Sequence, residues 1–248
     1  MGRALHEEKP PNIKNEDVVT NRIGTLNEKP LHAALKQWYA QPGDLTEVSV
    51  DGFTIDIVRG DLLIEIQTRN LSAIKRKLMT LVEQHPVRLV YPIAQDKWIV
   101  RQSRKGKCTL GVGPRKSPKR GTVELVFEEL VSLPHLLTHP NFSMDVLLIQ
   151  EEEVRRQADT RSWRRKSWSL HERRLLQVVE RRLFETPHDL LALLPLALTE
   201  PFTTTDLAQA TGRPLWLAQK MAYCLREMGA ITAVGKRGRG ILYVRAAA

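Results

Sequence analysis

Residues 50–78 read VDGFTIDIVRGDLLIEIQTRNLSAIKRKL, and the predicted fold depends on this stretch. Two runs in which apolar side chains alternate with others, residues 52–58 and 62–68, predict the two strands of a hairpin. Gly60 and Asp61 lie between them, and glycine supplies the positive φ that a two-residue hairpin turn requires. A run with one apolar helical face follows the hairpin and predicts a helix.

The turn sets the register of the hairpin and brings two acids together. With Arg59 opposite Leu62, Asp56 lies opposite Glu65, and alternation makes one face polar: Thr54, Asp56, Glu65 and Gln67. Carboxylates at opposite positions are about 5 Å apart at Cβ and repel each other. A divalent cation would offset this repulsion, and Mg²⁺ binds one or two carboxylates together with water and substrate phosphate. A solvated sheet face on which the charges turn apart accounts for the same pattern.

Length and composition restrict the class of protein. The chain has 248 residues, of which 42% are hydrophobic, so it can form one large domain or two ordinary ones. A net charge of +10 and a pI of about 9.8 indicate a polyanionic partner, nucleic acid before acidic membrane. The two cysteines and seven histidines show no metal-ligand pattern, which argues against a zinc site. Without a membrane-length apolar run or a secretory leader, we expect no membrane association and a cytoplasmic location.

The segments around the hairpin predict a mixed α/β layer structure. Residues 1–27 are polar and predict a flexible N-terminal arm. A helix is expected to begin at Glu28, with Leu31, Ala34, Leu35 and Trp38 on one face. Residues 46–50 either continue into the hairpin or, if Asp51 and Gly52 form a turn, make a separate strand. The later expected elements are a helix over 71–84, strands over 87–93 and 97–101, a basic loop over 102–121, a helix or strand over 122–132, and a strand over 143–149.

Basic residues and tryptophans dominate the sequence after residue 155. Arginine combined with Trp163 and Trp168 suits phosphate contact plus base stacking. A solvated basic linker over 156–169, followed by a helix over 169–184, fits the same composition. We expect the helix and leave the nucleic-acid role of this segment open.

The end of the chain predicts a second domain over 170–248. After a short apolar helix come a helix over 205–210, a turn containing Gly212, a longer helix opened by Pro214, and a hairpin with a basic glycine-rich tip. This order resembles a winged helix-turn-helix domain, in which the second helix of the motif enters the major groove and the wing contacts the backbone or minor groove. By that resemblance, the DNA-binding residues are Arg213, Trp216, Gln219, Lys220, Lys236, Arg237 and Arg239. A winged helix that contacts protein is the alternative.

The first domain, over 28–155, resembles the PD-(D/E)xK superfamily, which has the restriction-endonuclease-like fold. The match rests on a helix, a strand with Asp56, a turn, a strand with Glu65 and a second helix, and it covers about residues 28–101. The resemblance implies a mixed sheet flanked by helices. Gln67 stands where the family usually has lysine, and in some members that lysine lies on the following helix, where this chain has Lys75 and Lys77. Glu28 and His32 are candidates for a further site residue from the first helix.

The two resemblances together imply a DNA-binding, metal-dependent endonuclease of a repair or defence type. Its substrate would be double-stranded or branched DNA, and Mg²⁺ or Mn²⁺ would bind Asp56 and Glu65. The catalytic set is Asp56, Glu65, Gln67 and Lys75. Because Gln67 carries no charge, the alternative is a catalytically inactive, nuclease-like DNA-binding regulator. A basic scaffold without a nucleic-acid role is a third interpretation, and homodimerisation stays open because the sequence shows no interface.

Overall fold

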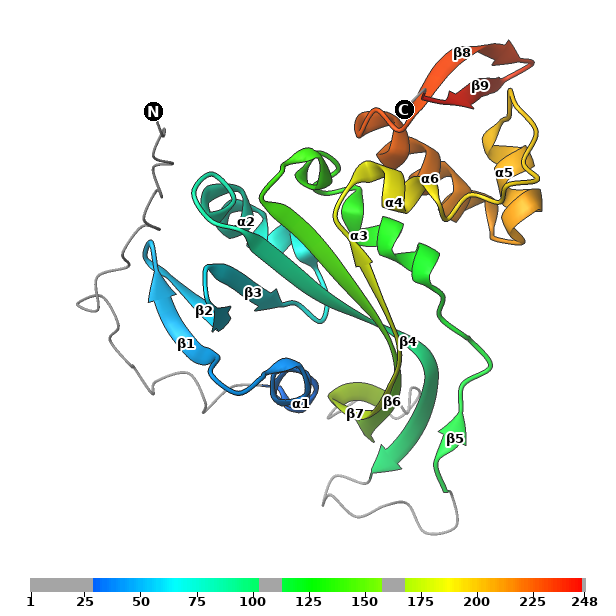
Figure 1. Ribbon diagram of the computed structural model, residues 1–248. Helices are drawn as coiled ribbons and strands as arrows, with labels where there is room; N and C mark the ends of the chain where they lie inside the picture. The colour runs from blue at the N-terminus through cyan, green and yellow to red at the C-terminus, as the bar shows by residue number, and fades with distance from the viewer. Residues whose placement is uncertain (1–28, 103–112, 158–167, 247–248) are drawn as a thin grey trace, which may run out of the picture.

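The structure is a computed structural model that describes residues 29–102, 113–157 and 168–246 (Figure 1). The predicted arm over 1–27, Glu28 and Trp163 lie outside the described residues, as does much of the predicted basic loop over 102–121. No helix in the part of the chain that the structure describes is long and apolar enough to cross a membrane.

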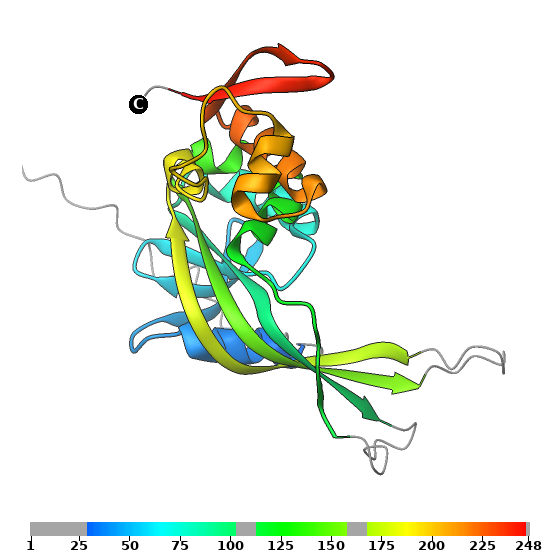
Figure 2. The same cartoon turned by 90° about the vertical axis from the view of Figure 1, so that its right-hand side faces the viewer.

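A mixed sheet of seven strands forms the body of the molecule, in the order β1-β2-β3-β4-β6-β7, with β5 paired to β4. The strands are β1 (Leu45–Val50), β2 (Phe53–Arg59), β3 (Leu62–Ile66), β4 (Val87–Gln102), β5 (Arg115–Lys116), β6 (Phe142–Gln157) and β7 (Trp168–Phe184). Strands β3, β4 and β6 are parallel, whereas β1–β2, β2–β3 and β6–β7 pair antiparallel. Strands β4, β6 and β7 extend together beyond the helices as a long curved ribbon (Figure 2).

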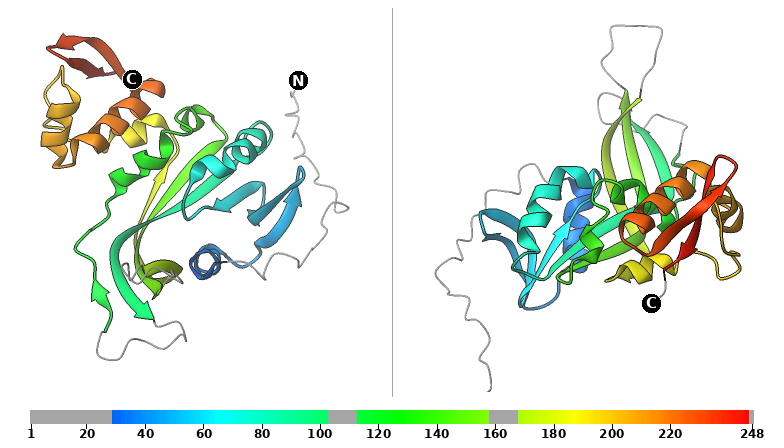
Figure 3. Two further views of the ribbon diagram at one scale, coloured as in Figure 1. Left: turned by 180° about the vertical axis from the view of Figure 1, so that it is seen from behind. Right: turned by 90° about the horizontal axis from the view of Figure 1, so that it is seen from above.

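Helices cover both faces of this sheet. Helix α1 (Pro30–Tyr39) packs on one face, where its buried residues join apolar side chains of β3, β4 and β6. The elements of the other face and of the C-terminal unit are η2 (Leu71–Ile74), α2 (Lys75–Leu81), η3 (Val123–Val126), α3 (Phe127–Leu130), η4 (Leu136–Thr138), α4 (Pro187–Leu191), α5 (Thr204–Thr211), α6 (Leu215–Glu227), β8 (Ile231–Arg237) and β9 (Gly240–Arg245). The β8–β9 hairpin lies at the opposite end of the molecule from α1 (Figure 1 and Figure 3).

The hairpin that the sequence predicts is present, and it keeps the predicted register up to the pair of Ile57 with Ile64, one position before Asp56 and Glu65. Arg59 pairs with Leu62 and Ile57 pairs with Ile64, and Gly60 has a φ of 57° at the turn. Asp51 and Gly52 form a second turn with φ values of 51° and 78°. The alternative of a separate strand before this turn is therefore confirmed, and that strand is β1.

Helix α1 follows the prediction with one shift of its buried face. Leu31 and Leu35 are buried as expected, but Trp38 is 46% exposed and Tyr39 is buried in its place. Tyr39 reaches the interior because its hydroxyl donates a hydrogen bond to the buried Asp145 of β6, at 2.5 Å.

The predicted helix over 169–184 is wrong, because these residues belong to strand β7. The strand pairs with β6 from Phe184 opposite Met144 to Trp168 opposite Gln157. Irregularities in this ladder place Leu175 and Val178, three residues apart, against the same cluster beneath α1. Such bulges imitate the spacing of a helix face. The sheet thus continues to Phe184, past the predicted boundary at residue 155, and the described ends of the predicted linker lie in strands.

The predicted order of helix, turn, helix and hairpin is present after β7. Thr203 caps α5 in a reciprocal capping box with Asp206, and Gly212 ends that helix with a φ of 64°. A single bridge between Phe202 and Tyr243 attaches the segment before α5 to β9. Helix α6 buries Leu217, Ala218, Met221, Ala222, Cys224 and Leu225, whereas Leu215 at its start is 44% exposed.

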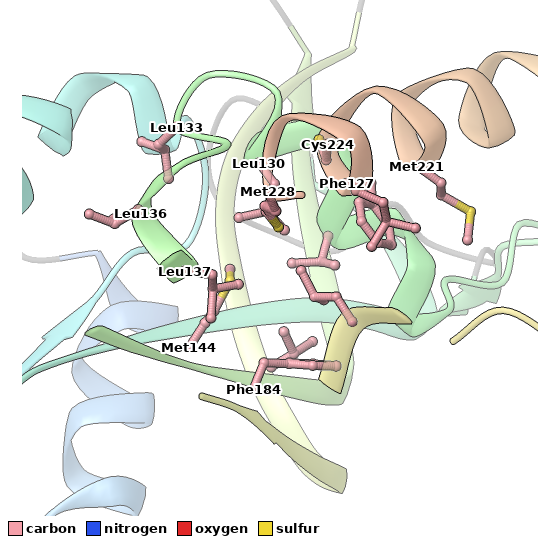
Figure 4. Packing of buried hydrophobic residues seen from close by; sticks show 14 of the residues in the cluster. Phe127, Leu130, Leu133, Leu136, Leu137, Met144, Phe184, Met221, Cys224 and Met228 are labelled. Carbon is pink, nitrogen blue, oxygen red and sulfur yellow. The ribbon is translucent and has the colours of Figure 1, made fainter. Parts of the chain in front are cut away.

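One hydrophobic core connects the C-terminal helices to the sheet. Phe127 and Leu130 of α3 pack in the same cluster as Met221 and Cys224 of α6 and Phe184 at the end of β7 (Figure 4). The two predicted domains therefore share an apolar interior.

Candidate functional site

Asp56 lies on β2 and is held from two sides. Its Oδ2 atom accepts a hydrogen bond from the backbone N–H of Ile66 at 2.8 Å and lies 3.2 Å from Nε2 of His32. The aspartate side chain is only 13% exposed. Strand β3 and helix α1 thus fix the position of one predicted carboxylate, and His32 contributes the contact from the first helix.

Glu65 is the most buried acid of the predicted site, at 8% exposure on β3. Lys77 of α2 places Nζ 2.6 Å from Glu65 Oε2, and this ammonium also donates to the carbonyl oxygen of Thr54. Oε2 of Glu65 is buried, and the Lys77 ammonium is its close partner. Glu65 is therefore paired with a cation inside the protein.

Burial raises the pKa of Glu65 to about 7. The negative charge of Asp56 raises this pKa as well, whereas Lys77 and His32 lower it. The two acids that the sequence placed opposite each other therefore interact electrostatically. Near neutral pH, this carboxyl exchanges between its protonated and its charged form.

The other two predicted catalytic residues are Lys75 and Gln67, and each has other surroundings than Asp56 and Glu65. Lys75 is exposed at the start of α2, and it is Lys77 that approaches Glu65. Gln67 follows β3, where its backbone N–H donates to Val90 O and its side-chain amide donates to Asn70 O at 3.2 Å. The amide of Gln67 is thus held toward the loop that precedes α2.

A buried polar network that the sequence did not reveal lies on the α1 face. Arg181 of β7 donates to Asp145 Oδ2 at 2.6 Å and to the hydroxyl of Tyr39 at 3.0 Å. Burial and the neighbouring carboxylate raise the pKa of Tyr39 to about 12. The network joins α1 to β6 and β7, and its three residues lie far apart in the sequence, so no local pattern predicted it.

The predicted DNA-contacting side chains of α6 share an exposed face. Trp216 is 44% exposed, Gln219 is exposed, and Lys220 Nζ lies 5.5 Å from the centroid of the Trp216 ring. Tyr223 continues this face one turn later, at 39% exposure. The surface combines a cation with aromatic rings, which suits contact with phosphate and bases.

The remaining predicted DNA contacts divide into two groups. Lys236 and Arg239 are exposed on the β8–β9 hairpin. Arg237 forms an ion pair with Asp206 of the α5 capping box, and Arg213 donates to Glu124 of η3 at 3.2 Å. The structure thus places Arg213 at the junction between the C-terminal unit and the sheet.

Comparison with known proteins gives a family for this chain. An uncharacterized protein of Treponema pallidum (strain Nichols) is 32% identical over 222 residues, which is 89% of this chain and 86% of the relative. No solved structure matches significantly. A family model described as a domain of unknown function, DUF8091, matches residues 29–185, the part from α1 through β7. The chain belongs to the DUF8091 family.

Proposed function

We propose that this protein binds DNA and hydrolyses its phosphodiester bonds with the help of a divalent cation. The observation that carries the proposal is the convergence of Asp56, Glu65 and Lys77 from β2, β3 and α2. Two carboxylates with a lysine beside them form a set of groups that can bind a cation and neutralise a phosphate.

The arrangement of elements supports this proposal. Helix α1, strand β2 with Asp56, a turn, strand β3 with Glu65 and then α2 follow the order that the resemblance to the PD-(D/E)xK superfamily implies. Lys77 supplies from α2 the positive charge that Gln67 lacks. The fold therefore provides a substitute for the lysine that is missing from the second strand.

The carboxylates fit a cation that keeps part of its water shell. The described residues contain no group of three or more His, Cys, Asp and Glu side chains that could hold a metal ion. Asp56 and Glu65 would be sufficient for Mg²⁺ or Mn²⁺ if water and phosphate complete the shell, and Lys77, whose Nζ lies 2.6 Å from Glu65 Oε2, would be placed to neutralise the phosphate. The bound ion would activate water and stabilise charge on the phosphate. Glu65 must lose its proton to bind the ion, and its pKa of about 7 makes binding depend on pH.

The C-terminal unit is proposed to hold the DNA. The α5–turn–α6 segment, the β8–β9 hairpin and the Phe202–Tyr243 bridge support the resemblance to a winged helix-turn-helix domain. The contact residues would be the exposed Trp216, Gln219, Lys236 and Arg239 together with the half-buried Lys220. The net charge of +10 favours a polyanionic partner.

The catalytic part is tested by a nicking and cleavage assay on plasmid and branched DNA with Mg²⁺ or Mn²⁺. Asp56→Asn and Glu65→Gln should each abolish cleavage while DNA binding persists, because the variants keep the side-chain shape and remove the charge. Asp61→Asn, at the exposed turn of the same hairpin, is the matched control and should cleave normally. Full cleavage by either site variant would disprove the catalytic assignment.

The DNA-binding part is tested by measuring affinity as a function of salt. Affinity should fall steeply with salt, and replacing Lys236 and Arg239 together by alanine should reduce the log–log slope by about 2. Arg76→Ala, an exposed change on α2, should leave the slope unchanged. An affinity that does not respond to salt argues against DNA binding.

A DNA-binding regulator without catalysis is the second candidate function. The observation that favours it is Gln67, which lies at the position of the family lysine and turns its amide to Asn70 O. Binding to DNA with no cleavage under either metal would select this function over the nuclease.

A further inference from the structure

A second candidate site lies in a cleft on the face of the sheet opposite α1. The cleft has a volume of about 500 Å³ and lies where β4, β6 and β7 meet α4 and the turn between α5 and α6. None of Asp56, Glu65 and Lys77 lines it. The cleft is thus separate from the proposed catalytic site.

The cleft carries an excess of positive charge. Its charged lining residues are Arg120, Arg182, Arg213 and Glu124. Arg120 is exposed and makes no ion pair with any residue that the structure describes, whereas Arg182 pairs with Glu180 outside the lining. Arg213 shares its charge with Glu124. Arginine presents a planar set of donors that matches phosphate, so the lining favours a phosphorylated ligand.

Two buried polar atoms at the cleft lack hydrogen-bond partners. They are Oε2 of Glu124, an acceptor, and Nε of Arg213, a donor, and neither has a partner among the residues described. Buried polar atoms in folded proteins are nearly always hydrogen-bonded. A ligand with both a donor and an acceptor could satisfy the two atoms at once.

The segment that presents Arg120 and Glu124 is firmly attached to the sheet. The backbone N–H of Gly121 donates to the carbonyl oxygens of Ala94 and Gln95, both at 3.1 Å, at the irregularity in β4. A Cβ atom at position 121 would lie 2.3 Å from Ala94 O, so only glycine permits this approach. The backbone that carries Arg120 and Glu124 is therefore fixed against β4.

We propose that this cleft binds a nucleoside monophosphate. The phosphate would lie against Arg120 and Arg182, and an N–H group of the base would donate to Glu124 Oε2. The volume lies within the range of about 300–1,000 Å³ that is usual for small-molecule sites. This inference does not depend on the nuclease proposal, because the cleft is lined by β4, β6 and β7, whereas the proposed catalytic residues lie on β2, β3 and α2.

Isothermal titration calorimetry of the full-length chain tests the proposal, with AMP, GMP, CMP, UMP and inorganic phosphate as separate ligands. At least one nucleotide should bind about tenfold or more tightly than inorganic phosphate, because Glu124 adds a contact that phosphate alone cannot make. Arg120→Ala should weaken this binding about ten- to one-hundredfold. Arg115→Ala is the matched control, because Arg115 is exposed on the same segment and does not line the cleft, and it should bind like the wild type.

Glu124→Ala separates the two parts of the proposed contact. It removes the acceptor for the base, so it should lose most of the preference for the nucleotide over inorganic phosphate and should bind inorganic phosphate at least as tightly as the wild type. Failure of all four nucleotides to bind would overturn the proposal, as would equal affinities of Arg120→Ala and Arg115→Ala. A third outcome would also overturn the proposal: the wild type binds no nucleotide, and Arg120→Ala loses DNA binding. That result would assign the cleft to DNA. The variant Glu65→Gln should bind the nucleotide with the affinity of the wild type. Failure of the nuclease proposal can therefore be distinguished from failure of the nucleotide-binding proposal.

Discussion

At the scale of single residues, the pairing of Glu65 with Lys77 yields a prediction about stability. Lys77→Ala removes the cation beside a carboxylate that is 8% exposed, so the free energy of unfolding should fall by about 2 kcal/mol near pH 8. The loss is limited because Glu65 can take up a proton. Lys75→Ala, on the same helix and exposed, should change the free energy of unfolding by less than about 0.5 kcal/mol. Urea denaturation measures both values, and equal losses would contradict the assignment of Lys77.

The raised pKa of Glu65 predicts how stability depends on pH. The folded state holds this proton up to about pH 7, whereas the unfolded state releases it near 4.5. Between these values the folded state binds more protons, so the contribution of Glu65 to stability falls as pH rises. Glu65→Gln removes this titration, and the variant should gain roughly 3 kcal/mol relative to the wild type between about pH 4 and about pH 8. A difference in the free energy of unfolding between the two proteins that stays constant over this pH range would contradict the raised pKa of Glu65.

The acids of the candidate site and a lysine from the following helix were predictable from sequence, but the choice of Lys77 over Lys75 was not. Alternation and the glycine turn placed Asp56 and Glu65 together, because both rules act over a few residues. The predicted helix over 71–84 is present as η2 followed by α2, and its packing on the sheet brings Lys77 to Glu65 and leaves Lys75 exposed.

At the scale of elements, substitutions of the neighbouring Arg181 and Arg182 test the register of strand β7. Arg181 contacts the fully buried Asp145, whereas Arg182 on the other side pairs with the exposed Glu180. Arg181→Ala should reduce the free energy of unfolding by about 2 kcal/mol, because Asp145 loses its cation. Arg182→Ala should cost less than about 0.5 kcal/mol. Denaturation of the two variants distinguishes them, and a larger loss for Arg182→Ala would contradict the register of β7.

Strand β7 shows why local patterns were insufficient for this part of the fold. The residues around Leu175 and Val178 have helical spacing, and arginine and leucine are good helix formers. Pairing with β6 overrides this preference, since opposite charges such as Arg173 and Glu151 meet across the ladder at 2.6 Å. The partner strand is distant in sequence, so its effect was not readable from the segment itself.

At the scale of the whole molecule, the relation between the C-terminal unit and the sheet was the least predictable feature. The boundary near residue 155 was inferred from a shift in composition. The structure instead joins the two parts through the apolar contacts of α3 with α6 and through the Arg213–Glu124 pair. Both contacts link segments far apart in the chain, and neither leaves a local pattern.

The shared core predicts that the molecule unfolds as one unit. Phe127 of α3 and Met221 of α6 are fully buried in one continuous cluster that also contains Phe184 of β7. Separating the C-terminal unit from the sheet would expose these side chains to water, so the two parts should melt together. Differential scanning calorimetry should therefore show one transition with equal calorimetric and van't Hoff enthalpies. The variant Arg213→Ala should also show a single transition, because it removes the ion pair with Glu124 and leaves the apolar packing of α3 against α6. Two resolved transitions in the wild type would show that the sheet and the C-terminal unit are independent domains, as the composition of the sequence had indicated.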